Sequence, residues 1–401
     1  MIIDNYPSLP EWLSCPLPTI RPSGLVWQAG RDNPGPSSTA PLLKRFAACL
    51  LAGEYVDSKT INLPGATITL PNGMALYRRF RDLVENRYEQ HGLRPHGYPS
   101  LLPLSVFAQT TQMFSLENRL FKVGTDQDFK DNRPQAALSP TGEAAIYSHW
   151  SHCVKQASDL PIELYREASY FRPKGPHASS GNSIFRALES SGVYEFHCCY
   201  ENSAQAAPQA AQFAEMLKEI CTSLRLPVLW SIRPRWTNNS AVALATLAAD
   251  LPLPMGKTLQ VAALYDQADL FSRQYQIQYS HAGQRVHTYN LSGFCSKRLA
   301  TSHLLWSINE RDMLACAPAQ AVFQLGLIAK QDAAAPVVAE LQSLLSADGV
   351  RLAPASRLAT KRIKTAVHYC QQQGIPLSIV ISAEAEKHLV CIFTRTDNNQ
   401  E

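Results

Sequence analysis

The residues best suited to chemistry lie between Leu160 and Tyr200, where two apolar segments flank a polar loop rich in Ser, Gly and Pro. This pattern predicts a β-hairpin. Arg172 ends the first predicted strand and Arg186 lies on the return leg. Two guanidiniums across one hairpin suit a polyphosphate, because each presents a planar fork of donors and keeps its charge. Phe196 lies where a flat ring can stack on a base. An ordinary surface hairpin with two solvated arginines fits the same residues.

A second candidate begins at His287 and reads HTYNLSGFCSKR up to Arg298. We expect a strand, a turn at the small residues Ser292-Gly293, and a helix from Lys297. Glycine in such a turn lets the backbone approach a ligand. Arg298 at the helix start would direct a positive charge towards a terminal phosphate.

A third candidate is the segment Ser139-Pro140-Thr141-Gly142-Glu143. A ligand ammonium group needs a carboxylate and an aligned oxygen acceptor, and Glu143 and Thr141 offer both. Thr141 also fits the position of a cap at the start of a helix that runs through His152. Both interpretations are compatible with one structure.

Together these segments resemble the motifs of the class II aminoacyl-tRNA synthetases. A predicted helix over residues 73–91, followed by a strand that ends at Pro103, is similar to motif 1. Phe171-Arg172 and the return to Phe196 resemble motif 2, and residues 287–298 closely resemble motif 3 of seryl enzymes. The resemblance implies an α+β fold, with an antiparallel sheet of six or seven strands flanked by helices and a small C-terminal α/β domain.

The resemblance also implies ATP and Mg²⁺ as cofactors, with Arg172 and Arg298 as the catalytic cations. The implied ATP-binding residues are Arg172, Arg186, Phe196, Gln260 and Arg298. The implied amino-acid-binding residues are Thr141, Glu143, Lys174, Glu195, Asn290 and Ser292.

Two positions depart from the family pattern, because Lys174 and Gln260 stand where glutamates are expected. The first reverses a charge beside the amino-acid pocket, and the second removes a carboxylate that magnesium normally uses. A zinc site at His197, Cys198 and Cys199 is an alternative to buried, inert thiols, which we favour. We therefore predict that the protein's own residues form no metal-binding site.

The 401 residues are 45% hydrophobic and carry a formal net charge of +4, which permits contact with nucleic acid without requiring it. We expect an irregular segment with a short helix over residues 1–60, the catalytic domain over 61–312 and an anticodon-binding-like domain over 313–401. The scattered cysteines and a first segment without a secretory leader predict the cytoplasm. No apolar run approaches the length of a membrane span.

The predicted function is ATP-dependent formation of an aminoacyl-adenylate and transfer of the aminoacyl group to tRNA by a homodimer. The expected amino acid is of serine, proline or threonine type, serine-like before proline-like. One alternative is a paralogue that aminoacylates a carrier protein, which the short, Pro-rich N-terminal segment favours. Another is a degenerate synthetase kept as a binding or regulatory subunit, which Lys174 and Gln260 favour.

Overall fold

The computed structural model describes residues 39–61, 66–114, 120–173, 184–185, 188–234, 242–253, 257–308, 312–330, 334–358, 362–382 and 389–394. The chain divides into two compact units. The first consists of residues 1–35, 80–180 and 185–299, and the second of residues 36–79, 181–184 and 300–401. None of the helices in the described ranges is long and apolar enough to cross a membrane.

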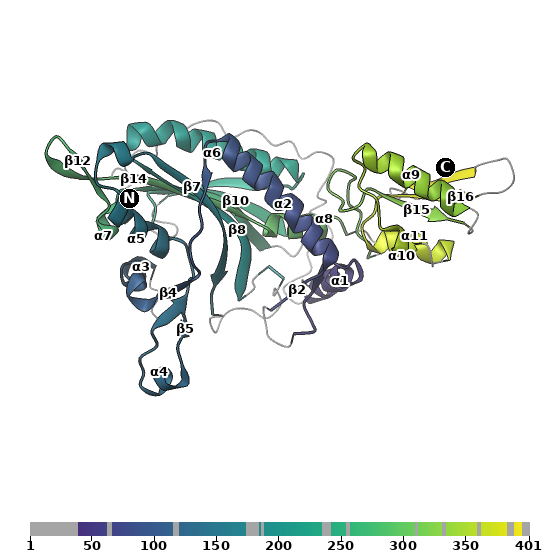
Figure 1. Cartoon of the computed structure of the whole chain (residues 1–401), viewed down its shortest axis with the longest axis horizontal. Coiled ribbons are helices and arrows are strands. Elements are labelled where there is room, and N and C mark those ends of the chain that lie inside the picture. Colours follow the sequence, from purple (N-terminus) through teal and green to yellow (C-terminus); the bar gives the residue numbers. More distant parts are fainter. Residues whose placement is uncertain are drawn as a thin grey trace, which may run out of the picture. The chain divides into compact units, whose positions relative to one another are not determined.

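The first unit is built on one large sheet with the strand order β3-β7-β8-β14-β11-β10-β9 (Figure 1). Its strands are β3 (Arg94–Pro95), β7 (Ile162–Phe171), β8 (Glu189–Tyr200), β9 (Leu229–Pro234), β10 (Ala245–Leu253), β11 (Lys257–Ala268) and β14 (Tyr289–Ser296). Only the β3–β7 pair is parallel, and the other neighbours are antiparallel. The sequence prediction of an α+β fold on an antiparallel sheet of six or seven strands is confirmed.

Two smaller sheets and several helices complete the first unit. The small sheets pair β4 (Leu101–Pro103), β6 (Ala136–Leu138) and β5 (Phe121–Val123), and β12 (Gln278–His281) with β13 (Gln284–His287). The helices are α3 (Ala108–Phe114), α4 (Asp126–Lys130), α5 (Glu143–Cys153), α6 (Ser203–Ser223) and α7 (Leu270–Tyr275), while α2 (Pro71–Gln90) and α8 (Arg298–Trp306) belong partly to each unit.

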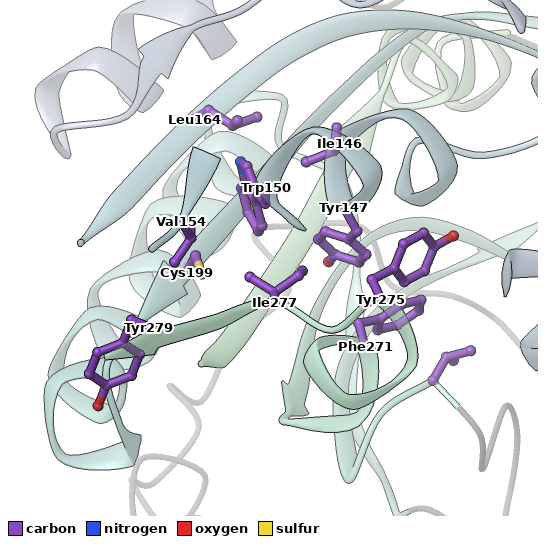
Figure 2. Packing of buried hydrophobic residues seen from close by; sticks show 11 residues of the cluster. Ile146, Tyr147, Trp150, Val154, Leu164, Cys199, Phe271, Tyr275, Ile277 and Tyr279 are labelled. Atoms are coloured by element: carbon purple, nitrogen blue, oxygen red, sulfur yellow. The ribbon is translucent and has the colours of Figure 1, made fainter. Parts of the chain in front are cut away.

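Side chains of β8 alternate between the two faces of the sheet, as in any strand. Phe196 points towards the helices, where its ring lies 5.5 Å from Tyr88 of α2 and 5.0 Å from Phe213 of α6. Its neighbours Glu195 and His197 therefore point to the opposite face. On that face α5 and α7 bury a cluster of aromatic and aliphatic residues against the sheet, which includes Tyr147 and Trp150 (Figure 2).

One segment differs in type from its prediction. The sequence pattern predicts a strand over residues 271–279, but the structure has helix α7 there, followed by β12. Asp269 and Arg273 form an ion pair of 2.7 Å across four positions, which is a spacing that favours a helix.

Gly293 lies within β14, so the predicted turn at Ser292-Gly293 is wrong. The missing side chain makes room for a ring, because an ideal Cβ on Gly293 would lie 2.7 Å from Cε1 of Phe196 and 2.8 Å from the Ala263 carbonyl oxygen. A glycine in a strand commonly marks such a close approach.

We expect Gly293→Ala to lower the free energy of unfolding by about 1–3 kcal/mol, because the added methyl overpacks the sheet against Phe196. Denaturant unfolding measures this change. Gly97→Ala is the matched control, since nothing lies within 4 Å of a Cβ there, and we expect a change within about 0.5 kcal/mol. Equal stability of the two variants would contradict the packing argument.

The second unit contains a short N-terminal helix and a three-stranded sheet. Its elements are α1 (Thr39–Ala52), β1 (Val56–Asp57), β2 (Ile68–Thr69), β15 (Leu325–Ala329), α9 (Ala335–Ala347), α10 (Ala355–Leu358), α11 (Ile363–Gln372), β16 (Leu377–Ser382) and β17 (Leu389–Thr394). Alternating strands and helices in this part of the sequence predict a mostly parallel sheet, but the sheet is mixed, because β15 pairs parallel and β17 antiparallel with β16. The domain limits given above stay predictions.

Candidate functional site

The loop between β6 and α5 carries Thr141 and leads directly into Glu143, the first residue of α5, so residues 139–143 are called the loop below. The Thr141 hydroxyl donates to the Glu143 carboxylate, so both oxygen-bearing groups lie together. The N-cap of α5 is Gly142, which makes no side-chain cap bond, so Thr141 does not cap the helix. The loop is fixed in place by Ser139, whose hydroxyl donates to the Thr141 carbonyl oxygen at 2.6 Å.

Arg172 joins this loop to the β7–β8 hairpin. Its Nε donates to the Pro140 carbonyl oxygen at 2.9 Å, and the neighbouring Phe171 amide donates to the Ser139 carbonyl oxygen at 3.0 Å. The sequence placed Arg172 and Thr141 in separate motifs about 30 residues apart. The structure brings them to one site.

Arg298 reaches the same end of the hairpin. Its Nη2 lies 3.4 Å from the Ser190 hydroxyl oxygen. Ser190 is the cross-strand partner of Tyr170, and such partners point to the same face of a sheet. The backbone amide of Arg172 donates to the Leu188 carbonyl oxygen at 2.9 Å. Both predicted catalytic cations are thus attached to one end of the hairpin.

A buried polar cluster lies on this face of the sheet, centred on Glu195. Arg166 Nε and His197 Nε2 each lie 3.5 Å from the Glu195 carboxylate, and the Tyr170 hydroxyl also donates to it. His197 continues the chain of polar contacts through its Nδ1, which lies 3.0 Å from the Tyr147 hydroxyl. Of this cluster, the sequence indicated Glu195 as an amino-acid-binding residue and His197 only as an alternative zinc ligand, whereas Arg166, Tyr170 and Tyr147 were not singled out.

The half-buried Glu143 and the buried Glu195 have opposite pKa shifts. Burial raises the pKa of Glu143, and the charge of Glu195 adds to this effect. Burial also disfavours the charged form of Glu195, but its contacts with His197, Arg166 and Tyr170 outweigh this and lower its pKa. Glu195 is thus held ionised by its partners, whereas Glu143 gains a proton more readily than an ordinary glutamate.

Gln260 and Tyr265 extend the site across β11. The pKa of Tyr265 is raised to about 12, chiefly by burial and also by the Glu143 charge, while Arg172, Arg233 and a hydrogen bond with Gln260 oppose this shift. These interactions indicate that Gln260 lies in the same region as the loop and Arg172. Arg233 also pairs with Asp250 of the neighbouring strand.

The remaining predicted residues fall in different places. Ser292 is buried opposite His197 and Tyr265, in the site. Asn290 is buried deeper, where its Oδ1 accepts a hydrogen bond from the Thr288 hydroxyl at 3.3 Å. Lys174 and Arg186 lie outside the described residues.

Among the predicted ligand-binding residues that the structure describes, Phe196 has a placement that contradicts its role. It is fully buried on the helix-covered face of the sheet, away from Glu195. The sequence contained a signal for this, since Tyr194, Phe196 and Tyr200 alternate with Glu195 and His197. A period of two puts the aromatic residues together on one face.

The three candidate zinc ligands do not converge. His197 and Cys199 lie on one face of β8 and Cys198 on the other, because successive strand residues alternate. Within the part of the chain that the structure describes, no group of three His, Cys, Asp or Glu residues is arranged to hold a metal ion.

No protein-family model matches the chain. Proline–tRNA ligase from Methanopyrus kandleri is 24% identical over 364 residues, which cover 89% of this chain and 73% of the relative. Prolyl-tRNA synthetase from Cryptosporidium parvum, solved with L-proline and AMP, superposes with a TM-score of 0.77 at 16% identity, over 89% of this chain and 71% of that chain. The Giardia lamblia enzyme, in complex with prolyl-adenylate, gives a TM-score of 0.73 at 22% identity, over 85% and 70% of the two chains.

The chain is similar in sequence to proline–tRNA ligases and has the fold of the class II aminoacyl-tRNA synthetases. The motif order in the sequence, the antiparallel sheet and the relatives all agree on this family. The relatives indicate a synthetase-like ligase, and the loop, hairpin and β14 described above are the elements that carry the segments resembling its motifs.

The described donor groups near Gln260 fit a magnesium ion poorly. Mg²⁺ favours several carboxylate or water oxygens in an octahedron. Of the groups near Gln260, Asp250 is already paired with Arg233, and Gln260 contacts Tyr265. We therefore assign no step to a metal held by the protein alone.

Proposed function

We propose that this synthetase activates an amino acid with ATP to form an aminoacyl-adenylate and transfers the aminoacyl group to tRNA. The observation that carries the proposal is the bond from Arg172 Nε to the Pro140 carbonyl oxygen. It couples the predicted phosphate-binding cation to the loop that presents Thr141 and Glu143. An amino acid held by the loop would then meet a nucleotide held by Arg172 at the same place.

In the first step, the substrate carboxylate attacks the α-phosphorus and pyrophosphate leaves. Thr141 and Glu143 hold the amino end of the substrate, which aims its carboxylate at the phosphate. Arg172 and Arg298 stabilise the charge that develops on the phosphate oxygens. The rate gain therefore comes from positioning and from fixed positive charge.

In the second step, a terminal hydroxyl of the tRNA attacks the activated carbonyl carbon and AMP leaves. The proposed amino acid is proline-type, which the relatives named as proline–tRNA ligases support. This reverses the order of serine before proline expected from the sequence. The half-buried Glu143 carboxylate and the adjacent Thr141 oxygen fit the two N–H donors of a secondary ammonium group.

We also propose a cytoplasmic homodimer. The described cysteines are free thiols, which fits a reducing compartment. Leu101 of β4 is 50% exposed. This strand ends at Pro103, and with the helix before it the strand resembles motif 1. An exposed leucine there fits a contact with a second copy.

Amino-acid-dependent exchange of pyrophosphate into ATP tests the proposed activation. We expect proline to support exchange, with serine and threonine weaker. Charging assays with total tRNA and with a holo carrier protein then identify the acceptor, and we expect only tRNA to be charged. Absence of exchange with every amino acid would remove the proposal and leave the binding-subunit alternative.

A further inference from the structure

The loop that carries Thr141 and Glu143 lies directly on the buried polar cluster. An ideal Cβ on Gly142 would lie 2.7 Å from the Tyr170 hydroxyl oxygen and closer still to Oε1 of Glu195. Gly142 therefore allows the backbone of the loop to touch both side chains. The position of this backbone depends on where the Glu195 carboxylate is held.

The Glu195 carboxylate is held from three sides. Arg166 and Tyr170, both on β7, contact the same oxygen, Oε1, and His197 contacts Oε2. The Arg166 side chain is only 4% exposed, and its guanidinium lies 5.7 Å from the centroid of the Tyr98 ring. A buried carboxylate without such partners would be strongly disfavoured, so these contacts fix both its charge and its place.

Arg166 and Tyr170 play no part in the proposed chemistry, because neither is assigned to substrate or ATP. Both contact Oε1 of Glu195, the oxygen that lies against Gly142. Gly142 stands between Thr141 and Glu143, the two residues assigned to the amino end of the substrate. A shift of about 1 Å in such a supporting group is enough to reduce catalysis about 100-fold.

We propose that Arg166 and Tyr170 are positioning residues for amino-acid binding, which act by holding Glu195 beneath Gly142 and so setting the place of Thr141 and Glu143. The proposal rests on the proposed function, since the loop must bind the amino end of a substrate. It assigns to the hairpin a role in amino-acid affinity separate from its role in nucleotide binding.

The direct test is a comparison of KM values in the exchange assay. We expect Arg166→Gln to raise the KM for the amino acid about tenfold or more and to change the KM for ATP less than about twofold. Arg166→Lys restores the charge and should recover part of the loss. Unchanged KM values, or an equal rise in both, would overturn the proposal.

Tyr170→Phe provides a second, milder variant if Arg166→Gln does not fold. It removes one hydrogen bond to Glu195 without removing a charge, and we expect a KM rise for the amino acid of about threefold to tenfold. Tyr200→Phe is the matched control. This variant also removes a hydrogen bond from a buried tyrosine to a carboxylate, that of Glu163. Tyr200 and Glu163 lie on the same pair of strands, but on the face of the sheet opposite to Glu195.

Hydrogen exchange separates this proposal from the proposed function, because it needs no activity. The amides of Phe171 and Ile146 bond to the carbonyl oxygens of Ser139 and Gly142, so they report on the loop. We expect both amides to exchange faster in Tyr170→Phe than in Tyr200→Phe. Equal exchange would overturn the positioning role even if the wild type is active, and faster exchange would support it even if no amino acid is activated.

Discussion

Replacing Arg172 with alanine is expected to abolish amino-acid-dependent exchange of pyrophosphate into ATP. A fixed cation or donor aimed at developing charge contributes about 10²–10³-fold to the rate. Arg172 also donates to the Pro140 carbonyl oxygen, so its loss releases the loop that holds the amino acid. We therefore expect kcat to fall and both KM values to rise, which distinguishes this variant from Arg166→Gln.

Arg172→Lys and Arg285→Ala are the controls for this prediction. Lysine keeps the charge but lacks the planar fork, so we expect it to recover only part of the rate. Arg285 is an exposed arginine of the same unit whose Nη1 bonds to the Lys155 carbonyl oxygen, and its removal should leave exchange unchanged. Activity of Arg172→Ala near the wild-type level would show that the hairpin does not bind the reacting phosphate.

The sequence carried enough information to predict the sheet and the order of the motifs. The β7–β8 hairpin, the helix α6 and the strand β14 all form where apolar residues recur at the proper spacing. The spacing of Thr141 and Glu143 also predicted a pair of oxygen groups at one loop. These features depend on short stretches of chain, where local pattern is informative.

The face on which a side chain lies was harder to predict. Phe196 looked like a base-stacking ring because it is an aromatic residue on the return strand of a hairpin that resembles motif 2. Alternation in a strand puts it on the other side, against the helices. Likewise, the glycine in β14 suggested a turn, but its lack of a side chain makes room for this ring.

The supporting residues of the site could not be predicted from local pattern at all. Arg166 and Tyr170 read as ordinary members of a strand, and Gly142 as part of a loop. Their contacts depend on the antiparallel register that sets Arg166 opposite Glu195, and on the return of the loop to that place. Such long-range contacts appear only when the chain is folded.

The second large effect is expected for Glu143→Gln, which removes the carboxylate from the amino-end subsite. A hydrogen bond to a charged group contributes about 1.5–3 kcal/mol, so we expect the KM for the amino acid to rise about 10- to 100-fold. The KM for ATP should change little, because Arg172 remains in place. Glu163→Gln is the matched control, since Glu163 contacts Tyr200 on the other face of the same strand pair.

The pH dependence of amino-acid binding provides an independent readout of Glu143. Burial, with the Glu195 charge, raises its pKa, whereas His197 and the Thr141 hydroxyl act in the opposite direction. A carboxyl group is neutral below its pKa and then attracts an ammonium group weakly. We therefore expect the wild-type KM for the amino acid to rise as pH falls through this raised pKa. Glu143→Gln should have a high KM throughout and lack this rise, because its side chain does not titrate. A wild-type KM that is independent of pH, or an equal rise in the variant, would assign amine recognition to another group, and the ionised Glu195, which lies against Gly142, is a carboxylate that could supply it.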